Sequence, residues 1–408
     1  MLRARLSLTG RPGLTAIAAA TVLMSALVAT VATPADAAGC RRFALTDAGS
    51  GETVHGIEDL AWHRQSERLI LSAMGDPDAP DSPRGIYGLS FKRMKREFIE
   101  PSREPALPVP RLTELFQDET PLAPHGIAIW DPSIPTGFLD RRVSLANARL
   151  MVINHRERNT ETLDDGSPAT TVEVFEIAPN GELDHVATYG DNSLCPANDL
   201  TALDGERALI TLDRRHCGGL ASAWEMATDR SGGRVVAVDL VSGLPPETLL
   251  ENLDFPNGIA VTEFAQDEPQ YMYIAETRAR RIRRFAFADG RITDSGTELP
   301  VPGGPDNLSI DSAGHVVTAL HPDLFRLFLV KQGLSLKGRA PSRLVAVDGP
   351  VEGAKARACN VMHDDPDGDG FSGATAALRI GGLLIAGSAH DDGLLVCTDP
   401  GTEAPACE

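Results

Sequence analysis

Positive charge is scarce in this sequence: 38 Lys and Arg residues stand against 57 Asp and Glu residues, giving a net charge of -19 at pH 7. A nucleic-acid-binding face needs a basic patch, so we expect no nucleic-acid partner. The chain also lacks a Gly-x-Ser-x-Gly elbow and a His-Glu-x-x-His helix, which argues against a serine hydrolase and a zincin. Long helical patterns are few, and no low-complexity linker divides the chain after its N-terminal segment.

The N-terminal segment has the pattern of a secretory signal. Its basic residues are Arg3, Arg5 and Arg11. An apolar run follows over residues 14–31, and small residues up to Ala37 provide a cleavage site. We therefore expect a signal peptide over 1–38, one domain over 39–408, and a secreted or extracytoplasmic protein. The alternative is membrane association, through an uncleaved signal or through a lipidated Cys40.

Six cysteines, all from Cys40 onwards, fit an exported protein in an oxidising compartment. Cys40 and Cys397 lie near the two ends of the expected domain, a natural position for a disulfide. Cys195 with Cys217 and Cys359 with Cys407 are plausible pairs. Spacing alone leaves the pairing open, because six cysteines allow fifteen pairings.

Short apolar or alternating segments typical of β-strands dominate after residue 55. They include residues 69–72, 150–153, 171–177, 234–238, 271–275 and 383–386. Asn180-Gly181 and Asp289-Gly290 predict hairpin turns. Only 221–228 and 323–332 have good helical patterns.

Pairs of oxygen-bearing residues precede several of these strands. The pairs are Glu58-Asp59, Asn198-Asp199 and Asp306-Asn307, together with Asn257, which precedes Gly258. Carboxylate and amide oxygens without a paired Cys or His suit calcium. The plain alternative is that Asn and Asp cap turns before strands. Their repetition indicates that distant parts of the chain bring these oxygens to one centre.

Recurrence of these strand entries every ~50 to 70 residues predicts blades of four-stranded sheet around an axis. Counting His125 as a further entry, we predict an all-β fold, a six-bladed β-propeller with a central calcium-containing tunnel. The sixth blade would come from the C-terminal third and be closed by the N-terminal strand. Two stacked β-sandwiches are the alternative.

The ordered set of motifs resembles the paraoxonase/arylesterase family. The segments that carry the resemblance are 56–60, 124–127, 152–155, 198–199, 254–259, 273–276, 306–309 and 321–322. The resemblance covers most of the chain from Cys40 to Cys397. It implies a six-bladed propeller with two calcium ions, one catalytic and one structural, that hydrolyses lactones, aryl esters and sometimes organophosphates.

The resemblance also implies residue roles. The catalytic calcium would be held by Glu58, Asn198, Asn257, Asp306 and Asn307, and the structural calcium by Asp59, Asp199 and the main-chain carbonyl of Ile127. His125 would be the general base, assisted by His155, and Phe255 and His321 would line the substrate pocket. Four carboxylates would balance two divalent ions, and the adjacent pairs Glu58-Asp59 and Asn198-Asp199 would each contribute once to each ion.

The sequence departs from the family pattern at the pocket wall, where Arg214 stands in place of a histidine that follows an aspartate, and in an insert over residues 105–122. Substrate range therefore stays open. Two other functions fit the same propeller: a sugar-lactonase-like hydrolase with a single metal, and a calcium-stabilised propeller that only binds a ligand.

Overall fold

The computed structural model describes residues 39–76, 79, 81–102, 106–113, 122–133, 147–228, 232–262, 270–288, 290–335, 337–348, 359–401 and 404–407. The expected signal peptide over 1–38 and half of the 105–122 insert, residues 105 and 114–121, lie outside the described residues. Within the described part, no helix has both the length and the apolarity that crossing a membrane requires.

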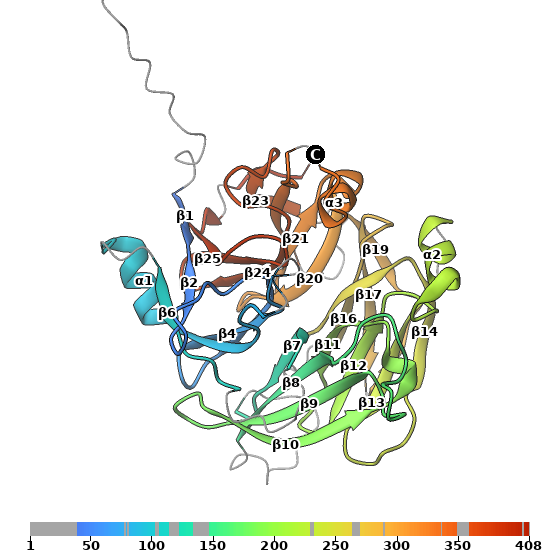
Figure 1. Ribbon diagram of the computed structural model, residues 1–408. Helices are drawn as coiled ribbons and strands as arrows, with labels where there is room; N and C mark the ends of the chain where they lie inside the picture. Colours follow the sequence, from blue (N-terminus) through green and yellow to red (C-terminus); the bar gives the residue numbers. More distant parts are fainter. Residues whose placement is uncertain are drawn as a thin grey trace, which may run out of the picture. The chain divides into compact units, whose positions relative to one another are not determined.

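Most of the described chain is β-strand, arranged in six main sheets that follow one another in chain order (Figure 1). The first sheet contains β3 (Ile57–His63), β4 (Arg68–Ala73) and β5 (Gly85–Ser90). The second contains β7 (Pro124–Trp130), β8 (Ala148–His155), β9 (Thr170–Ile177) and β10 (Leu183–Gly190). The third contains β11 (Ala197–Ala202), β12 (Arg207–Leu212), β13 (Gly233–Asp239) and β14 (Glu247–Leu253). The hairpin predicted at Asn180-Gly181 is confirmed between β9 and β10, where Gly181 has the positive φ of +83° that such a turn uses.

The remaining sheets complete the set. The fourth sheet contains β15 (Pro256–Val261), β16 (Gln270–Glu276), β17 (Arg281–Ala288), β18 (Arg291–Ile292) and β19 (Thr297–Pro300). The fifth contains β20 (Gly304–Ile310), β21 (Val316–His321), β22 (Ser342–Val347) and β23 (Cys359–Asp365). The sixth contains β24 (Ala374–Ile380), β25 (Leu383–Ser388), β26 (Leu394–Thr398) and β1 (Cys40–Phe43). A small parallel pair, β2 (Leu45–Asp47) and β6 (Leu107–Val109), lies beside the first sheet.

One strand from each sheet belongs to a closed ring at the centre of the propeller. These inner strands contact each other in the order β3, β7, β11, β15, β20, β24 and back to β3. The six-bladed propeller is thereby confirmed, and the alternative of two stacked sandwiches is wrong. Side chains of adjacent sheets share apolar clusters, as where Val174 packs with Ile210 and Leu209 with Ile274.

The last sheet joins the two ends of the domain, as predicted. Strand β1 pairs antiparallel with β26, placing Cys40 opposite Cys397, and these two cysteines form a disulfide. Cys195–Cys217 and Cys359–Cys407 are also disulfides. The N-terminal strand therefore closes the ring by hydrogen bonds and by a covalent bond.

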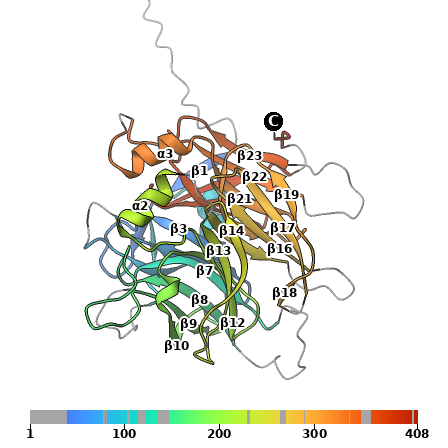
Figure 2. The same ribbon diagram turned by 90° about the vertical axis from the view of Figure 1, so that its right-hand side faces the viewer.

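Helices are few. The predicted helices are confirmed as α2 (Gly219–Ala227) and α3 (Leu324–Lys331), which lie together at one side of Figure 2. A third helix, α1 (Phe91–Ile99), was not predicted because charged residues dominate its sequence. Its Met94 is buried against the apolar cluster shared by the first and last sheets, so tertiary packing stabilises it.

Candidate metal centre and active site

Each inner strand begins with a site residue at its second or third position. In ring order these residues are Glu58, His125, Asn198, Asn257, Asp306 and Thr375. All six strands also have a register shift at this point against their hydrogen-bonded neighbour. Such bulges bend a strand and turn its side chains, and they are common beside functional sites.

Glu58 interacts with two residues of β20: it contacts Asn307 directly, and the charge of Asp306 acts on it. The amide nitrogen of Asn307 donates to the main-chain oxygen and to Oε1 of Glu58, both at 3.0 Å. The charge of Asp306 acts on Glu58 as well. Asp306 Oδ2 lies 2.6 Å from Nε2 of His321, which is only 2% exposed. Three of the five residues predicted for the catalytic calcium, Glu58, Asp306 and Asn307, thus interact although they lie far apart in the sequence, and His321 contacts Asp306.

Four oxygen atoms of this set are buried and make no hydrogen bond within the described part of the chain. They are Glu58 Oε2, Asn198 Oδ1, Asn257 Oδ1 and Asn307 Oδ1. An unsatisfied buried acceptor costs ~1–3 kcal/mol, so these four oxygens require an explanation. Hard oxygen donors of this type, with a carboxylate among them, fit the coordination preferences of calcium.

Asp213 orients one of these amides. It follows β12 directly, and Leu212, the last residue of β12, pairs with Ala197 at the start of β11. Burial raises the pKa of Asp213 to about 6, against the opposing effects of Arg214 and of a hydrogen bond with the Asn198 side chain. The Asn198 amide nitrogen donates to Asp213, and the amide oxygen of Asn198 makes no hydrogen bond within the described part of the chain.

Asp59 and Asp199 are placed differently from the first set. Asp59 accepts hydrogen bonds from the main-chain N–H groups of Leu60 at 2.7 Å and Ile127 at 2.8 Å. Asp199 accepts from Leu200 at 2.7 Å and Ile259 at 2.9 Å. Each carboxylate therefore ties its own strand to the next inner strand of the ring, β3 to β7 and β11 to β15. Of Ile127, the structure shows the N–H group engaged with Asp59.

Gly126 permits this close approach of strands. A Cβ atom on Gly126 would lie 2.7 Å from Cα and Oδ1 of Asp199 and 2.8 Å from the carbonyl oxygen of Asn198. Gly258 is similar, since its Cβ would lie 2.5 Å from the carbonyl oxygen of Asp306. These distances are far below van der Waals contact, so the glycines are required for the inner ring to close around the site residues.

Without a bound cation, the ionised form of the carboxylates at this centre is electrostatically unfavourable. Burial, and then the charges of Asp59 and Asp306, raise the pKa of Glu58 well above its usual value. Burial raises the pKa of Asp59 to about 7. Burial, and then the charge of Asp59, raises the pKa of Asp199 well above normal. Buried carboxylates that raise one another's pKa by their charges favour either a bound proton or a bound cation.

His125 lies beside the centre with one ring nitrogen committed. Its Nδ1 donates to the carbonyl oxygen of Asn198 at 2.7 Å and lies 3.8 Å from Glu58 Oε2. In this tautomer the lone pair is on Nε2. Burial, and then the charge of Arg158, lower the pKa of His125 to about 4. The imidazole is therefore neutral at pH 7 and able to accept a proton.

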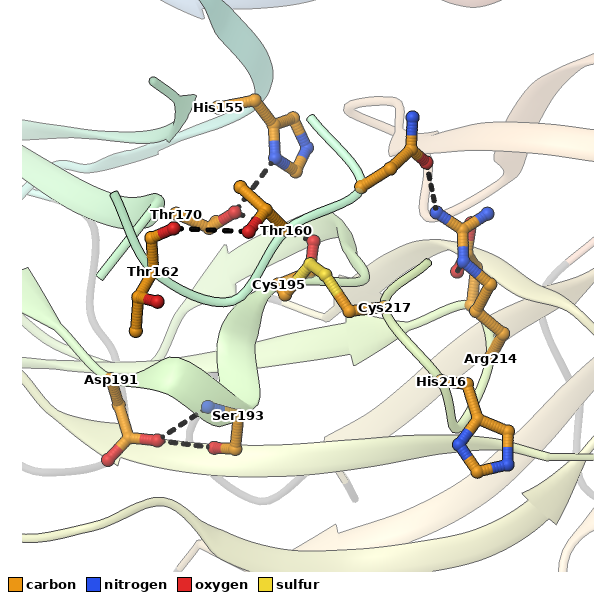
Figure 3. The surroundings of a disulfide bond; sticks show 12 residues. His155, Thr160, Thr162, Thr170, Asp191, Ser193, Cys195, Arg214, His216 and Cys217 are labelled. Atoms are coloured by element: carbon orange, nitrogen blue, oxygen red, sulfur yellow. Dashed lines mark hydrogen bonds and ion pairs between the residues drawn. A yellow bond between two sulfur atoms is a disulfide. The ribbon is translucent and has the colours of Figure 1, made fainter. Parts of the chain in front are cut away.

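His155 packs against His125 edge to face, with 5.3 Å between the ring centroids. Its Nδ1 lies 3.1 Å from the hydroxyl of Thr170, which in turn donates to the carbonyl oxygen of Cys195 at 3.4 Å. Figure 3 shows His155 and Thr170 beside the Cys195–Cys217 disulfide. Thr170 thus connects His155 with the main chain of Cys195, one of the two disulfide cysteines. A proton relay between the two rings stays a prediction.

Two site residues were missed by sequence reasoning. Thr375 occupies the sixth ring position, and its hydroxyl donates to the main-chain oxygen of Glu58 at 2.7 Å. The signal was present, since an apolar run follows Ala374-Thr375, but the pair carries no amide or carboxylate. Asp213 was noticed only as the residue before Arg214.

Phe255, which was predicted to line the substrate pocket, directly precedes β15. Its backbone φ is +55°, and the guanidinium of Arg278 lies 5.7 Å from the centre of its ring.

Comparison with known proteins finds a lactonase that matches part of the chain. No family model matches the chain. Over 99 residues the chain is 32% identical to a pentonolactonase of Haloferax volcanii, a match that covers 23% of this chain and 32% of that protein. The chain thus spans about a third of the length of this curated relative.

Solved structures similar to this one include a gluconolactonase from Xanthomonas campestris. Its sequence is 17% identical, the match covers 89% of this chain and 96% of that chain, and the TM-score is 0.45. Another is regucalcin, a calcium-binding protein from Agrobacterium tumefaciens, with 15% identity, coverage of 88% and 95%, and a TM-score of 0.42. These matches do not single out the paraoxonase/arylesterase family.

Proposed function

We propose that this protein is a calcium-dependent lactonase. The observation that carries the proposal is the group of four buried oxygens, on Glu58, Asn198, Asn257 and Asn307, that make no hydrogen bond within the described part of the chain. With Asp306, they would hold the ion. The partial match to a pentonolactonase supports the reaction class.

The chemistry follows from the positions of the side chains. A bound calcium would polarise the lactone carbonyl and favour the negative charge that develops on its oxygen. His125 would accept a proton from the attacking water at Nε2, since Nδ1 is committed to Asn198. It would return that proton to the ring oxygen as the C–O bond breaks, so the product is an open hydroxy acid. His155 would hold the His125 ring in place.

The number of ions distinguishes two versions of this proposal. A second, structural ion near Asp59 and Asp199 is supported by the mutual repulsion of these buried carboxylates. A single-metal enzyme is supported by their hydrogen bonds, because all four carboxylate oxygens already accept main-chain N–H groups. Elemental analysis of the dialysed protein separates them by a calcium-to-protein ratio of two or one.

Aryl esters would be substrates of the same centre, because their hydrolysis has the same carbonyl chemistry.

Export of the protein from the cytoplasm is also part of the proposal. It is supported by the three disulfides of the described chain, a feature of proteins from oxidising compartments.

The test is hydrolysis of a panel of γ- and δ-lactones and of phenyl acetate by purified protein, with calcium and with EGTA. We expect activity that disappears with EGTA, returns with calcium, and falls at least ~100-fold in His125→Gln. His216→Gln, a change at an exposed histidine, is the control. A folded, calcium-loaded protein that hydrolyses none of these compounds would show that the propeller is a binding module.

A further inference from the structure

Strands β8, β9 and β10 lie side by side in the second sheet (Figure 1), and a row of polar side chains crosses them. Thr171 and Glu173 stand two residues apart on β9, so their side chains lie on the same face of the sheet. Asn154 of β8 is paired with Thr171. Thr188 of β10 is paired with Glu173, so all four side chains share that face. Asn154, Thr171 and Glu173 are each at most 2% exposed.

Glu173 is the centre of this row. Its Oε1 accepts from the hydroxyl of Thr171 at 2.6 Å and from the side-chain nitrogen of Asn154 at 3.1 Å. Its Oε2 accepts from the hydroxyl of Thr188 at 2.5 Å and lies 3.1 Å from Nε2 of His185. Within the described part of the chain its ion-pair partner is His185, and neither a lysine nor an arginine pairs with it. A buried carboxylate destabilises a fold unless donors surround it in this way.

The hydrogen bond to Glu173 fixes the orientation of the Asn154 amide group. Because the amide nitrogen donates to Glu173, the amide oxygen faces the other way and accepts from the main-chain N–H of Ala123 at 3.0 Å. Turning the amide over would place its oxygen against the carboxylate and its NH2 group against the N–H of Ala123, and both contacts would be repulsive. Glu173 therefore determines which end of the amide meets Ala123.

Ala123 leads directly into the strand start that carries His125. The main-chain N–H of His155 donates to the carbonyl oxygen of Ala123 at 2.9 Å, so the end of β8 holds both main-chain groups of Ala123. Pro124 follows and has no N–H with which to fix the chain. The register shift of β7 comes next, between Pro124 and Ile127, and His125 lies within it.

His125 is held at two further points. Its carbonyl oxygen accepts from the hydroxyl of Ser72 on β4 at 2.6 Å, and its ring Nδ1 donates to the carbonyl oxygen of Asn198 on β11 at 2.7 Å. The first, second and third sheets thus each contribute to its position. The contribution of the second sheet is the one that Glu173 controls through Asn154. A shift of the β7 start would disturb the Nδ1 hydrogen bond and redirect Nε2, the nitrogen that would accept the proton.

We propose that Glu173 is a positioning residue for His125, acting through the Asn154 amide and the main chain of Ala123. This inference rests on the proposed lactonase function and adds to it a residue that, within the described chain, forms no hydrogen bond with a proposed metal ligand. Misplacing a catalytic group by ~1 Å can cost ~100-fold in rate. Loss of this support should therefore lower kcat and leave KM nearly unchanged.

The test is a double-mutant cycle of Glu173→Met, Asn154→Leu and the two changes together. Each single variant leaves one buried polar partner unsatisfied, whereas the double variant replaces both partners by apolar groups, which restores part of the lost stability. Glu173→Gln is the conservative variant: its amide oxygen can still accept from Asn154, and its NH2 group would face the hydroxyl of Thr188, which can turn to accept.

Asp47→Asn is the control for stability alone. Asp47 is 2% exposed and accepts from Tyr87 at 2.8 Å and from Arg111 at 2.6 Å, and it lies on β2, outside the six main sheets. Each variant is measured for urea unfolding, for the calcium-dependent rise in Tm, and for kcat and KM on a lactone that the wild type hydrolyses. Nitrogen NMR of the His125 ring, assigned with His125→Gln, reports its tautomer and hydrogen bond in calcium-free protein.

We expect Glu173→Met and Asn154→Leu each to lower kcat at least ~10-fold and to change the His125 ring signals. The double variant should be more stable than either single variant and yet lose no more kcat than one of them, because both act by one route. Glu173→Gln should keep the wild-type kcat and ring signals. All of these variants should keep the calcium response, and Asp47→Asn should lose stability only.

A purely structural network gives a different pattern. A wild-type kcat in Glu173→Met, or a kcat that recovers together with stability in the double variant, would overturn the inference and leave the lactonase in place. Should a single variant not fold, the double variant decides by the same measurements, and failure of all three to fold would show that the network serves folding alone.

Failure of the lactonase is seen separately. If the wild type hydrolyses no lactone, the proposed function is wrong, and the His125 ring signals decide the positioning role. A change in Glu173→Met and Asn154→Leu that is absent from Glu173→Gln and Asp47→Asn would support it. Ring signals that are the same in every variant would refute it.

Discussion

Replacing Glu58 by Gln should change stability in opposite directions with and without calcium. Glu58 Oε1 accepts from Asn307 at 3.0 Å, while Oε2 has no hydrogen-bond partner and lies 3.8 Å from Nδ1 of His125. Glutamine has the same shape and retains an oxygen for Asn307. The substitution therefore removes one charge and leaves the other contacts in place.

Without metal, Glu58→Gln should be more stable than the wild type at pH 7.5. Burial and the charges of Asp59 and Asp306 raise the pKa of Glu58 in the folded protein. A carboxyl group whose pKa is higher folded than unfolded binds its proton more tightly in the folded state, so stability falls as pH rises through the folded pKa. Glutamine has no such proton, so the variant should lose part of this pH dependence.

With calcium, the order should reverse. Free calcium at one hundred times Kd stabilises a folded protein by ~2.7 kcal/mol. A neutral amide in place of a charged ligand should weaken binding ~100-fold, because ligand charge is a main determinant of calcium affinity. At the same free calcium the variant would gain only ~0.4 kcal/mol, and the calcium-dependent rise in Tm should almost disappear.

The assay is thermal and urea unfolding at pH 5.5 and 7.5, with EGTA and with buffered calcium. The control is Glu182→Gln, at an exposed glutamate in the turn between β9 and β10, which should leave both quantities unchanged. A Glu58→Gln protein that loses stability in EGTA and keeps the full calcium response would refute the assignment of Glu58 as a ligand.

Three other predictions concern neighbouring parts of the site. Gly126→Ala should cost ~1–3 kcal/mol or more in urea unfolding and much of the activity, because its Cβ would lie 2.7 Å from the backbone of β11; Gly370→Ala, whose Cβ would meet only a side-chain oxygen at 3.2 Å, should fold nearly normally. His125→Gln should keep its Tm within a few degrees, and the wild-type kcat/KM should fall as pH drops toward about 4, where the imidazole gains a proton; a pH profile unchanged in the variant would contradict its role as base. Replacing both Cys195 and Cys217 by Ser should lower stability by ~3 kcal/mol from loop entropy and reduce activity, because Thr170 connects His155 with the main chain of Cys195; unchanged kcat would show that the role of the disulfide is limited to stability.

Much of the architecture could be predicted from local patterns. Alternating apolar segments locate the strands of the sheets, and Asn180-Gly181 locates a hairpin, because both depend on neighbouring residues. The amphipathic α1 was missed because its stabilising contacts come from other sheets. Six-fold repetition could be counted because each inner strand carries its own entry residues.

The sequence by itself determined which side chains are available at the centre and how often they recur, since Glu58, Asn198, Asn257 and Asp306 each stand at the start of an apolar segment. It suggested that adjacent pairs serve two ions by pointing in opposite directions, an argument that assumes regular strands. Three features were decided only by the tertiary structure. Every inner strand has a bulge at its start, the amide oxygens have no partner, and the carboxylates of Asp59 and Asp199 accept hydrogen bonds from neighbouring strands. These depend on register and on contacts between blades hundreds of residues apart, and no local pattern encodes the energy of such contacts.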